Sequence, residues 1–195
     1  SKKNKYFRGI NEQFSIDHCT HSFFGVSKTY ADLIVQEYGK NVGLKTVSFR
    51  GGCITGPNHS GAKLHGFLSY LVKLSLNKKR YSLIGYKGKQ VRDNLHSLDL
   101  VNCFWEFYKK PRKGEIYNIG GGRYSNCSII EALNAVENIT NIKIKREMIK
   151  KPRVGDHIWY ISNNSKFKKH YPNWKQKYNT KKIIEELIET TNFKK

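Results

Sequence analysis

The sequence has few acidic residues, no long apolar run and no closely spaced pair of cysteines. Among 195 residues, 15 are Asp or Glu and 36 are Lys or Arg, so the formal net charge is +21. No apolar run approaches the roughly 18 residues of a membrane-spanning helix. The basic N-terminus leads into no apolar stretch, so neither a membrane segment nor a signal peptide is predicted.

The cysteine pattern gives no zinc signature. No two of the cysteines form a Cys-x-x-Cys pair, and a chain of this length does not need disulfides to fold. His18 to His21 contains two histidines and a cysteine, but adjacent positions on a short loop rarely converge on one ion, so no metal is predicted. The cysteines are interpreted as free thiols in a reducing cytoplasm: Cys19, Cys53, Cys103 and Cys127.

The excess of basic residues leaves two interpretations open. A basic nucleic-acid-binding domain is one of them. However, lysines are spread along the whole chain, and the many asparagines and isoleucines fit a genome rich in A and T. We therefore expect no nucleic-acid partner and keep that class as the lesser alternative. The charge also suits a phosphorylated substrate.

Segments with strand and helix periodicity alternate, which is typical of an α/β fold. Apolar residues make up 38% and aromatic residues 13%, enough for a hydrophobic core. Ser128 with Glu131 predicts a capping box at the start of one helix. The other predicted helices cover 27–42, 65–77, 99–108, 164–169 and 180–191, and the predicted strands cover 45–50, 81–84, 93–96, 115–119 and 142–148.

The segment from Phe24 to Lys28 resembles the Tyr-x-x-x-Lys helix of the extended short-chain dehydrogenase/reductase superfamily, the nucleotide-sugar epimerases and dehydratases. In that family the lysine binds the nicotinamide ribose and lowers the pKa of the tyrosine, which acts as base. One helical turn puts both side chains on one face, and a fixed cation favours the phenolate. Lys28 matches the lysine, and an ordinary surface lysine is the alternative. Phe24 stands at the catalytic tyrosine position and lacks the hydroxyl.

Two arginine motifs resemble the family's diphosphate-binding segments. Gly85 to Asp93 is similar to Gly-x-Gly-x-Gln-x-Arg-Asp, where the arginine contacts the substrate diphosphate. A guanidinium suits this role because its planar fork forms paired bonds to phosphate. Arg153 to Asp156 is similar to the Arg-x-Gly-Asp that closes the nucleotide site. The resemblance thus assigns Arg92, Arg153 and Asp156 to substrate binding. The alternative is a solvated Lys/Arg turn for the first motif and a simple turn at Gly155 for the second.

The strand and loop after the first helix resemble those of the family as well. Phe49 to Pro57 ends in Gly-Pro, and Cys53 stands where many relatives have an asparagine that contacts the substrate. We assign Cys53 to the cofactor side of this site. Phe67 lies where the family lays a loop and helix over the nucleotide, and it either packs on the base or belongs to the core.

Two further segments are markers of the fold. Asp93 is expected to hold its loop, and Asp99 to cap the helix that follows His96. Tyr117 to Gly120 resembles the family's Tyr-Asn-Ile-Gly strand end, and Gly120 to Gly122 lacks the spacing of a dinucleotide fingerprint.

The order of these motifs is most similar to the CDP-paratose (tyvelose) 2-epimerase-like subgroup. The resemblance implies NAD as cofactor, a nucleotide-diphosphate sugar as substrate, a role in carbohydrate biosynthesis and a homodimer whose interface includes Ala31, Val35 and Tyr38. In such enzymes, oxidation at a sugar carbon and hydride return from the other face invert the centre.

The family's opening strand, Gly-x-x-Gly-x-x-Gly turn and helix have no counterpart here. We therefore expect the C-terminal portion of a longer protein, or a degenerate member without that half. Residues 1–58 are assigned to the end of a Rossmann-like domain and 59–195 to the nucleotide-sugar-binding region, with parts of 93–122 returning to the Rossmann sheet.

Two functions remain open at this point besides nucleic-acid binding. The first is an NAD-dependent epimerase whose proton acceptor comes from elsewhere, with Cys19, His21 and Cys53 as candidates. The second is a nucleotide-sugar-binding module whose catalysis has decayed.

Overall fold

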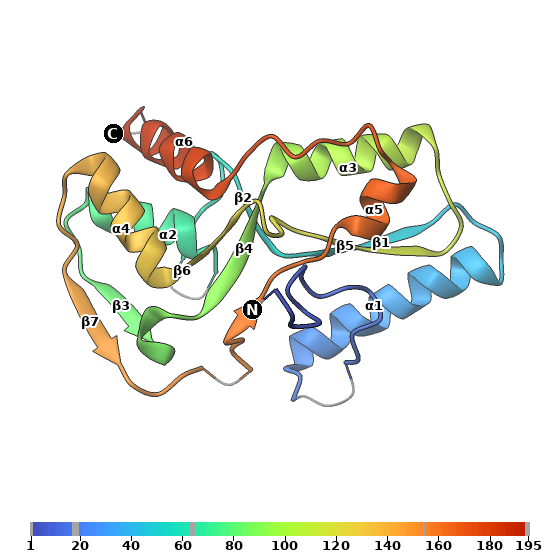
Figure 1. Cartoon of the computed structure of the whole chain (residues 1–195), viewed down its shortest axis with the longest axis horizontal. Helices are drawn as coiled ribbons and strands as arrows, with labels where there is room; N and C mark the ends of the chain where they lie inside the picture. The colour runs from blue at the N-terminus through green and yellow to red at the C-terminus, as the bar shows by residue number, and fades with distance from the viewer. Residues whose placement is uncertain (1, 17–19, 63–64, 154, 194–195) are drawn as a thin grey trace.

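A computed structural model describes residues 2–16, 20–62, 65–153 and 155–193, which form an α/β structure (Figure 1). Among these residues, no helix combines the length and apolar character that a membrane span requires. The elements are α1 (Phe23–Lys40), β1 (Val47–Gly51), β2 (Cys53–Thr55), α2 (Phe67–Leu76), β3 (Tyr81–Ile84), the 3-10 turn η1 (Tyr86–Gly88), β4 (Val91–His96), α3 (Ser97–Lys109), β5 (Glu115–Ile119), β6 (Asn126–Ser128), α4 (Ile129–Thr140), β7 (Arg146–Ile149), β8 (Trp159–Tyr160), α5 (Ser165–His170) and α6 (Thr180–Phe193).

One parallel pair of strands lies between two long helices. β1 and β5 pair in parallel, with Val47 opposite Glu115, and α1 and α3 lie on opposite sides of them (Figure 1). The α3 side is filled by a mainly aromatic core from β5, α3 and the segment through α5. On the other side, α1 approaches closely at its C-terminal end, because a Cβ on Gly39 would lie 2.0 Å from the amide nitrogen of Gly114.

The other strands form two small sheets beside a second core. β4 is central in one of them, parallel to β2 and β8 and antiparallel to β6. β3 and β7 form the other, a parallel pair. Side chains from α2, α4, α6 and β3 fill the second hydrophobic core. The chain therefore has two separate clusters of buried apolar residues, with β4 running between them (Figure 1).

Local signals place two helix starts. The capping box of α4 is confirmed: Ser128 Oγ accepts from the amide of Glu131 at 3.2 Å, and Glu131 Oε2 accepts from the amide of Ser128 at 2.6 Å. α1 begins at Phe23, four residues before the predicted start, because Ser22 Oγ accepts from the amide of Gly25 at 3.1 Å. Phe24 and Lys28 consequently both lie within the helix.

The cap predicted for α3 is wrong. His96 caps this helix, since its Nδ1 accepts from the amide of Leu98 at 3.1 Å. Asp99 lies in the first turn, and its carboxylate accepts from the amides of Lys177 and Tyr178 at 3.1–3.2 Å. This residue therefore anchors the segment that leads into α6.

Several other boundaries differ from the prediction by one to four residues. α2 begins at Phe67 rather than 65, after Gly66 in a left-handed conformation. The strand predicted over 142–148 begins only at Arg146, where pairing with β3 starts.

Candidate functional site

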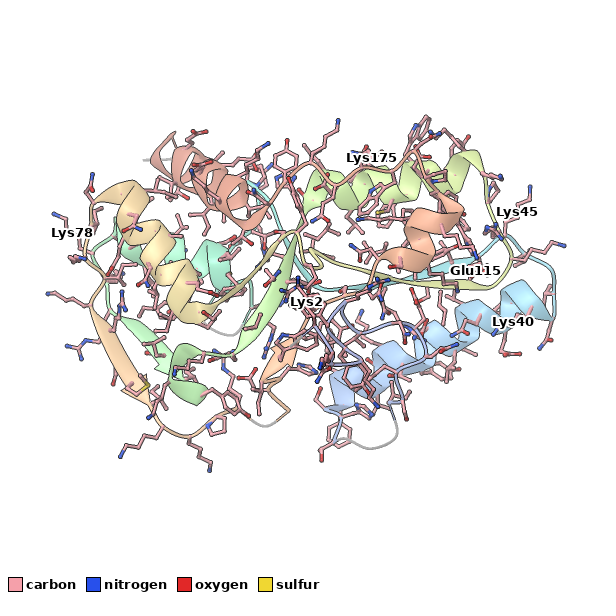
Figure 2. The ribbon with its side chains drawn as sticks, viewed as in Figure 1. Lys2, Lys40, Lys45, Lys78, Glu115 and Lys175 are labelled. Carbon is pink, nitrogen blue, oxygen red and sulfur yellow. The ribbon has the colours of Figure 1, made fainter. Side chains whose placement is uncertain are left out.

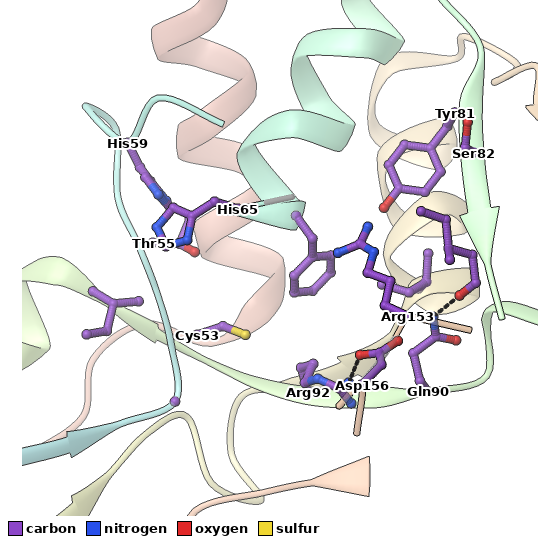
Figure 3. A pocket seen from close by; sticks show the side chains of 16 residues that line it. Cys53, Thr55, His59, His65, Tyr81, Ser82, Gln90, Arg92, Arg153 and Asp156 are labelled. Carbon is purple, nitrogen blue, oxygen red and sulfur yellow. Dashed lines mark hydrogen bonds and ion pairs between the residues drawn. The ribbon is translucent and has the colours of Figure 1, made fainter. Parts of the chain in front are cut away.

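A cleft of about 440 Å³ lies between α2, β3, the β2–β4 pair and the segment that ends at Asp156 (Figure 3). It is lined by Gly52, Cys53, Ile54, Thr55, His59, His65, Gly66, Phe67, Tyr81, Ser82, Ile84, Gln90, Arg92, Ile129, Arg153 and Asp156. Five of the seven residues assigned from the sequence thus meet in one cleft: Cys53, Phe67, Arg92, Arg153 and Asp156.

Arg92 is held by an ion pair across the cleft wall. Its Nη2 lies 2.6 Å from Oδ1 of Asp156, and its Nη1 donates to the carbonyl of Val91 at 2.8 Å. The two charged side chains are 15% and 20% exposed, so the pair is partly shielded from water. Asp156 therefore orients the guanidinium, and N–H groups of Arg92 remain available to a ligand because a guanidinium has five.

Arg153 supplies the second guanidinium of the cleft. It lies near Tyr81 of β3, where burial raises the pKa of the Tyr81 phenol to about 12 against the opposing effect of the Arg153 charge. Asp156 is the only acidic residue that lines the described cleft, and it is already paired with Arg92. The lining is therefore net cationic, which suits a phosphate-bearing ligand.

Cys53 lines the cleft as a protonated thiol. β2 places it opposite Asn94 of β4. Burial, with a further contribution from the nearby Asp93 charge, raises the pKa of the Cys53 thiol to about 11. At neutral pH this group is not a thiolate, so it is a poor proton acceptor.

Phe67 both packs against the hydrophobic core and lines the cleft, which are the two positions considered for it from the sequence. Its side chain is half-buried, packs against the core of α2, α4 and α6, and also lines the cleft. Stacking on a base remains a prediction for its cleft-facing side.

Phe24 and Lys28 lie outside this cleft, on α1. The Lys28 ammonium is 5.2 Å from the centroid of the Phe24 ring, so the two side chains share one face of the helix. Phe24 is 71% exposed. This face offers Lys28 as a group able to hold a cofactor ribose, while the ring beside it has no proton to exchange. Lys28 thus fits one part of a dinucleotide cofactor, its ribose.

The other candidates for a proton acceptor are only partly described. Cys19 lies outside the described residues, as does His18, which was considered only for a metal. His21 Nε2 is 2.6 Å from the carbonyl of Ile16 and must donate to it, because a carbonyl oxygen only accepts. Among the described residues, no group of three His, Cys, Asp or Glu side chains is arranged to hold a metal ion.

The sequence assignments missed the two histidines of the cleft. His59 and His65 belong to the loop between β2 and α2, and their ring centroids are 5.4 Å apart in an edge-to-face arrangement. Burial, and to a lesser degree the charge of His65, lowers the pKa of His59. Their position in the loop that follows the end of β2 was a usable signal, because ligands often bind beyond the carboxyl ends of parallel strands.

A buried carboxylate below the cleft organises the surrounding loops. Oδ2 of Asp93 accepts from the amides of Gly122 at 3.0 Å and Ser162 at 2.8 Å. Gly120 leaves the space for this contact, since a Cβ there would lie 2.2 Å from Oδ2. Asp93 therefore ties β4, which carries Arg92, to two chain segments that are distant in sequence.

The likeness to solved structures concerns the fold. UDP-glucose 4-epimerase from Thermotoga maritima, solved with UDP-glucose, superposes with a TM-score of 0.78 at 21% identity, over 88% of this chain and 53% of that one. A tyrosine-to-phenylalanine variant of Bacillus cereus UDP-glucuronic acid 4-epimerase, in complex with UDP-4-deoxy-4-fluoro-glucuronic acid and NAD, superposes with a TM-score of 0.78 at 20% identity, over 97% of this chain and 59% of that one. The α/β fold is therefore Rossmann-like.

Sequence comparison identifies the family. CDP-paratose 2-epimerase of Salmonella typhi is 30% identical over 145 residues, which are 70% of this chain and 42% of that protein. The chain thus spans less than half of that relative. A model of the NAD dependent epimerase/dehydratase family matches residues 7–120, more than half of the chain. The chain belongs to this family of NAD-dependent nucleotide-sugar enzymes.

Proposed function

We propose that the chain is the nucleotide-sugar-binding portion of an NAD-dependent epimerase of the CDP-sugar 2-epimerase kind, acting in carbohydrate biosynthesis. The observation that carries this proposal is the convergence of Arg92 and Arg153 on one cleft, with a single, already paired carboxylate. The match to CDP-paratose 2-epimerase supports the choice of a cytidine nucleotide.

Each residue has a physical role in this proposal. Arg92 and Arg153 bind the diphosphate, because guanidinium–phosphate bonds combine charge with directed hydrogen bonds. Asp156 positions Arg92, and Phe67 contacts the base. Lys28 holds the cofactor ribose on the exposed face of α1. NAD would take up and return the hydride during epimerisation.

A catalytically decayed binding module is the second candidate, and Phe24 favours it. The ring next to Lys28 has no hydroxyl, and the thiol of Cys53 stays protonated at neutral pH. The tyrosine-to-phenylalanine variant among the solved structures holds both a nucleotide-sugar analogue and NAD. That complex supports the second candidate, because a protein of this fold still binds both ligands after one tyrosine hydroxyl has been removed.

Titration calorimetry with CDP-glucose and UDP-glucose tests the binding proposal. Arg92→Ala should weaken binding by about 10- to 100-fold, since a hydrogen bond to a charged group contributes roughly 1.5–3 kcal/mol. Arg146→Ala is the matched control, because Arg146 of β7 pairs with Glu137 of α4 at 2.9 Å and does not line the cleft. Unchanged affinity in Arg92→Ala, with an unchanged melting temperature, would refute the assignment of Arg92 to diphosphate binding.

Product analysis separates the enzyme from the decayed module. The complete gene product is incubated with NAD and each nucleotide sugar, and epimerised or oxidised sugar is sought by NMR. Turnover with Phe24 in place excludes the catalytically decayed module. Tight binding without product supports that module. A nucleic-acid binder would instead lose affinity for DNA steeply with salt and show no preference between nucleotide sugars.

We also propose a homodimer that uses the outer face of α1. Tyr38 is 51% exposed and Leu33 is 52% exposed on this helix, so a sizeable apolar surface is available. Sedimentation velocity at two protein concentrations measures the assembly state. A cytoplasmic location stays a prediction from the scattered cysteines.

A further inference from the structure

We propose that Tyr160 receives the sugar proton in place of the tyrosine hydroxyl that α1 lacks, and that Ser162 and Asp93 pass this proton on. The inference rests on the proposed function in its epimerase form and names an acid–base residue of the same site. It follows from a cluster of hydroxyl and carboxyl groups beside the cleft.

Tyr160 lies on β8, near both binding regions of the proposed site. β8 runs parallel to β4, and Tyr160 stands opposite Arg92 in their register. The charge of Arg50 is close enough to lower the pKa of the Tyr160 phenol. Arg50 pairs with Asp32 of α1 at 2.5 Å, and Asp32 follows Lys28 by one helical turn, on the same face. Tyr160 is therefore close to the diphosphate arginine and to the side of α1 that carries the cofactor-binding candidate, and the reacting sugar must meet both.

A serine and a buried carboxyl continue from the Tyr160 hydroxyl. The Ser162 hydroxyl lowers the pKa of both Tyr160 and Asp93, so it lies beside both groups. The amide of Ser162 donates to Oδ2 of Asp93 at 2.8 Å, which holds the serine against the carboxyl. Oγ of Ser162 and Oδ1 of Asp93 are buried, and neither has a fully formed hydrogen bond within the described chain. Rotation of the Ser162 side chain completes the link from the phenol to the carboxyl.

Only a glycine separates this carboxyl from the cleft. Gly52 lies between the end of β1 and the start of β2 and lines the cleft. A Cβ at this position would lie 2.4 Å from Oδ1 of Asp93. The floor of the cleft therefore stays open beside the cluster, and Tyr160 is only half-buried.

The proton and the electron pair have separate destinations in this step. Oxidation breaks the C–H bond at the sugar carbon, and its electron pair leaves as hydride to NAD, the co-reactant of the proposed function. The sugar hydroxyl proton passes to the Tyr160 oxygen, the phenol proton passes to Ser162, and the serine proton passes to the Asp93 carboxylate. Return of the hydride to the other face reverses the three transfers.

The pKa shifts agree with a relay rather than a phenolate. Burial, and then the Asp93 charge, raise the pKa of Tyr160, so its phenol is neutral before and after the transfer. Burial also raises the pKa of Asp93, which makes its carboxylate a better final acceptor. No ammonium assists the phenol in this relay, so a tyrosine next to Lys28 would still be the stronger base.

His157 is the competing acceptor in the same cluster. Its ring centroid is 5.7 Å from that of Tyr160. Burial, and then the Arg92 charge, lower the pKa of His157, which makes its neutral imidazole a weaker base. His157→Gln therefore serves as the control that separates the histidine from the tyrosine.

Turnover of the complete gene product with NAD and a nucleotide sugar tests the relay. Tyr160→Phe should lower kcat by about 10²-fold or more, because a positioned acid–base group contributes 10²–10⁴. Asp93→Asn should lower kcat as well but keep the melting temperature, since an amide oxygen still accepts both N–H groups and cannot take the proton. His157→Gln should leave kcat unchanged, as should Tyr108→Phe, which alters a 73% exposed tyrosine on α3.

Calorimetry gives a second result that does not depend on turnover. Tyr160→Phe should weaken binding of CDP-glucose by roughly 2- to 10-fold, the effect of one hydrogen bond, and leave CDP unchanged because only the sugar reaches the phenol. UDP-glucose and UDP replace this pair if the uridine series binds. A purely structural role would weaken both ligands equally.

The outcomes separate the inference from the proposed function. Unchanged kcat in Tyr160→Phe, or a loss in His157→Gln instead, would overturn the relay and leave the epimerase in place. If Tyr160→Phe does not fold, Ser162→Ala decides, because it removes the linking hydroxyl and keeps the backbone bond to Asp93. Binding without any product in the native protein would refute the relay and leave the decayed module. Failure of every nucleotide to bind would refute the proposed function itself.

Discussion

Phe24 and Lys28 lie one turn apart on α1, with the Lys28 ammonium 5.2 Å from the centroid of the Phe24 ring. A hydroxyl added to this ring would stand beside a fixed positive charge, which favours the phenolate and makes the group a better base. If the proposed function holds, Phe24 limits the chemistry, and it is also the simplest residue to convert into a base.

Phe24→Tyr should raise epimerase turnover of the complete gene product by about 10²-fold or more, because a positioned general base typically contributes 10²–10⁴. Product formation with NAD and the nucleotide sugar is the measurement. Phe23→Tyr is the matched control, since Phe23 is 97% exposed on the same helix turn and should leave the rate unchanged. Equal rates in both variants would show that a different group accepts the proton.

Asp93 couples stability to pH. Burial raises its pKa above the ordinary value of 3.8, against the opposing hydrogen bonds from Gly122 and Ser162. The folded state then keeps the proton to higher pH than the unfolded chain does. The unfolded state binds fewer protons in that window, so this carboxyl lowers the free energy of unfolding as pH rises above 3.8.

Asp93→Asn should consequently preserve or increase the free energy of unfolding at neutral pH and flatten its pH dependence, because an amide oxygen still accepts both N–H groups. Asp93→Ala leaves two buried N–H groups unpaired and should cost about 2–6 kcal/mol, at roughly 1–3 kcal/mol each. Urea unfolding at several pH values measures both. Equal losses in the two variants would contradict the role given to the carboxyl.

The residues of the site differ in how readily the sequence reveals them. Arg92 and Arg153 were predictable because each belongs to a motif with fixed neighbours, and the structure brings both to one cleft. His59 and His65 were harder to identify, because loop histidines carry no periodicity: their place after a strand was the one signal in the sequence, and only the fold shows that they face each other. Asp99 was misassigned because an acidic residue near a helix start suits a cap, while His96 performs that role.

Helix α4 shows how far local signals determine an element. Its start was predictable because the capping box involves only Ser128 and Glu131, which are three residues apart. The start of α1 was placed too late because its apolar periodicity is weak in the first turn, where Phe23 and Phe24 are exposed. The short strand β7 depends on pairing with β3, which no local pattern encodes.

Ser128→Ala should lower the free energy of unfolding by about 0.5–2 kcal/mol, since it removes the oxygen that accepts from the Glu131 amide. Denaturant unfolding measures the loss. Asn138→Ala is the control on the same helix, because Asn138 is exposed and alanine favours helix. A loss in Asn138→Ala as large as that in Ser128→Ala would show that the effect does not arise from the cap.

At the scale of the whole molecule, the division into residues 1–58 and 59–195 stays a prediction. The structure contains two hydrophobic clusters, one around β5 and α3 and one around α2, α4 and α6. β1 of the first segment pairs with β5 of the second, so a simple cut in sequence does not separate the clusters. Pairing between strands so far apart could not be derived from periodicity alone.

The net charge of +21 has a consequence for the rate of ligand binding. Cationic side chains cover the molecule from Lys40 and Lys45 at one end to Lys78 at the other (Figure 2). Lys150 and Lys151 are exposed and closely precede Arg153 of the cleft. A diphosphate approaching this region is attracted before contact, and salt weakens that attraction because the Debye length falls from about 30 Å at 0.01 M to about 8 Å at 0.15 M.

The double substitution of Lys150→Gln and Lys151→Gln should lower the association rate constant of a nucleotide sugar at low salt severalfold and leave the dissociation rate constant nearly unchanged. The physical reason is that neither lysine lines the cleft, so they act on the approach rather than on the bound complex. Stopped-flow binding at several salt concentrations measures both constants. Lys45→Gln with Lys175→Gln removes the same charge from exposed positions outside the cleft lining and serves as the control. An equal slowing in both double variants would attribute the effect to net charge alone, whereas a slowing confined to the first assigns it to the approach beside Arg153.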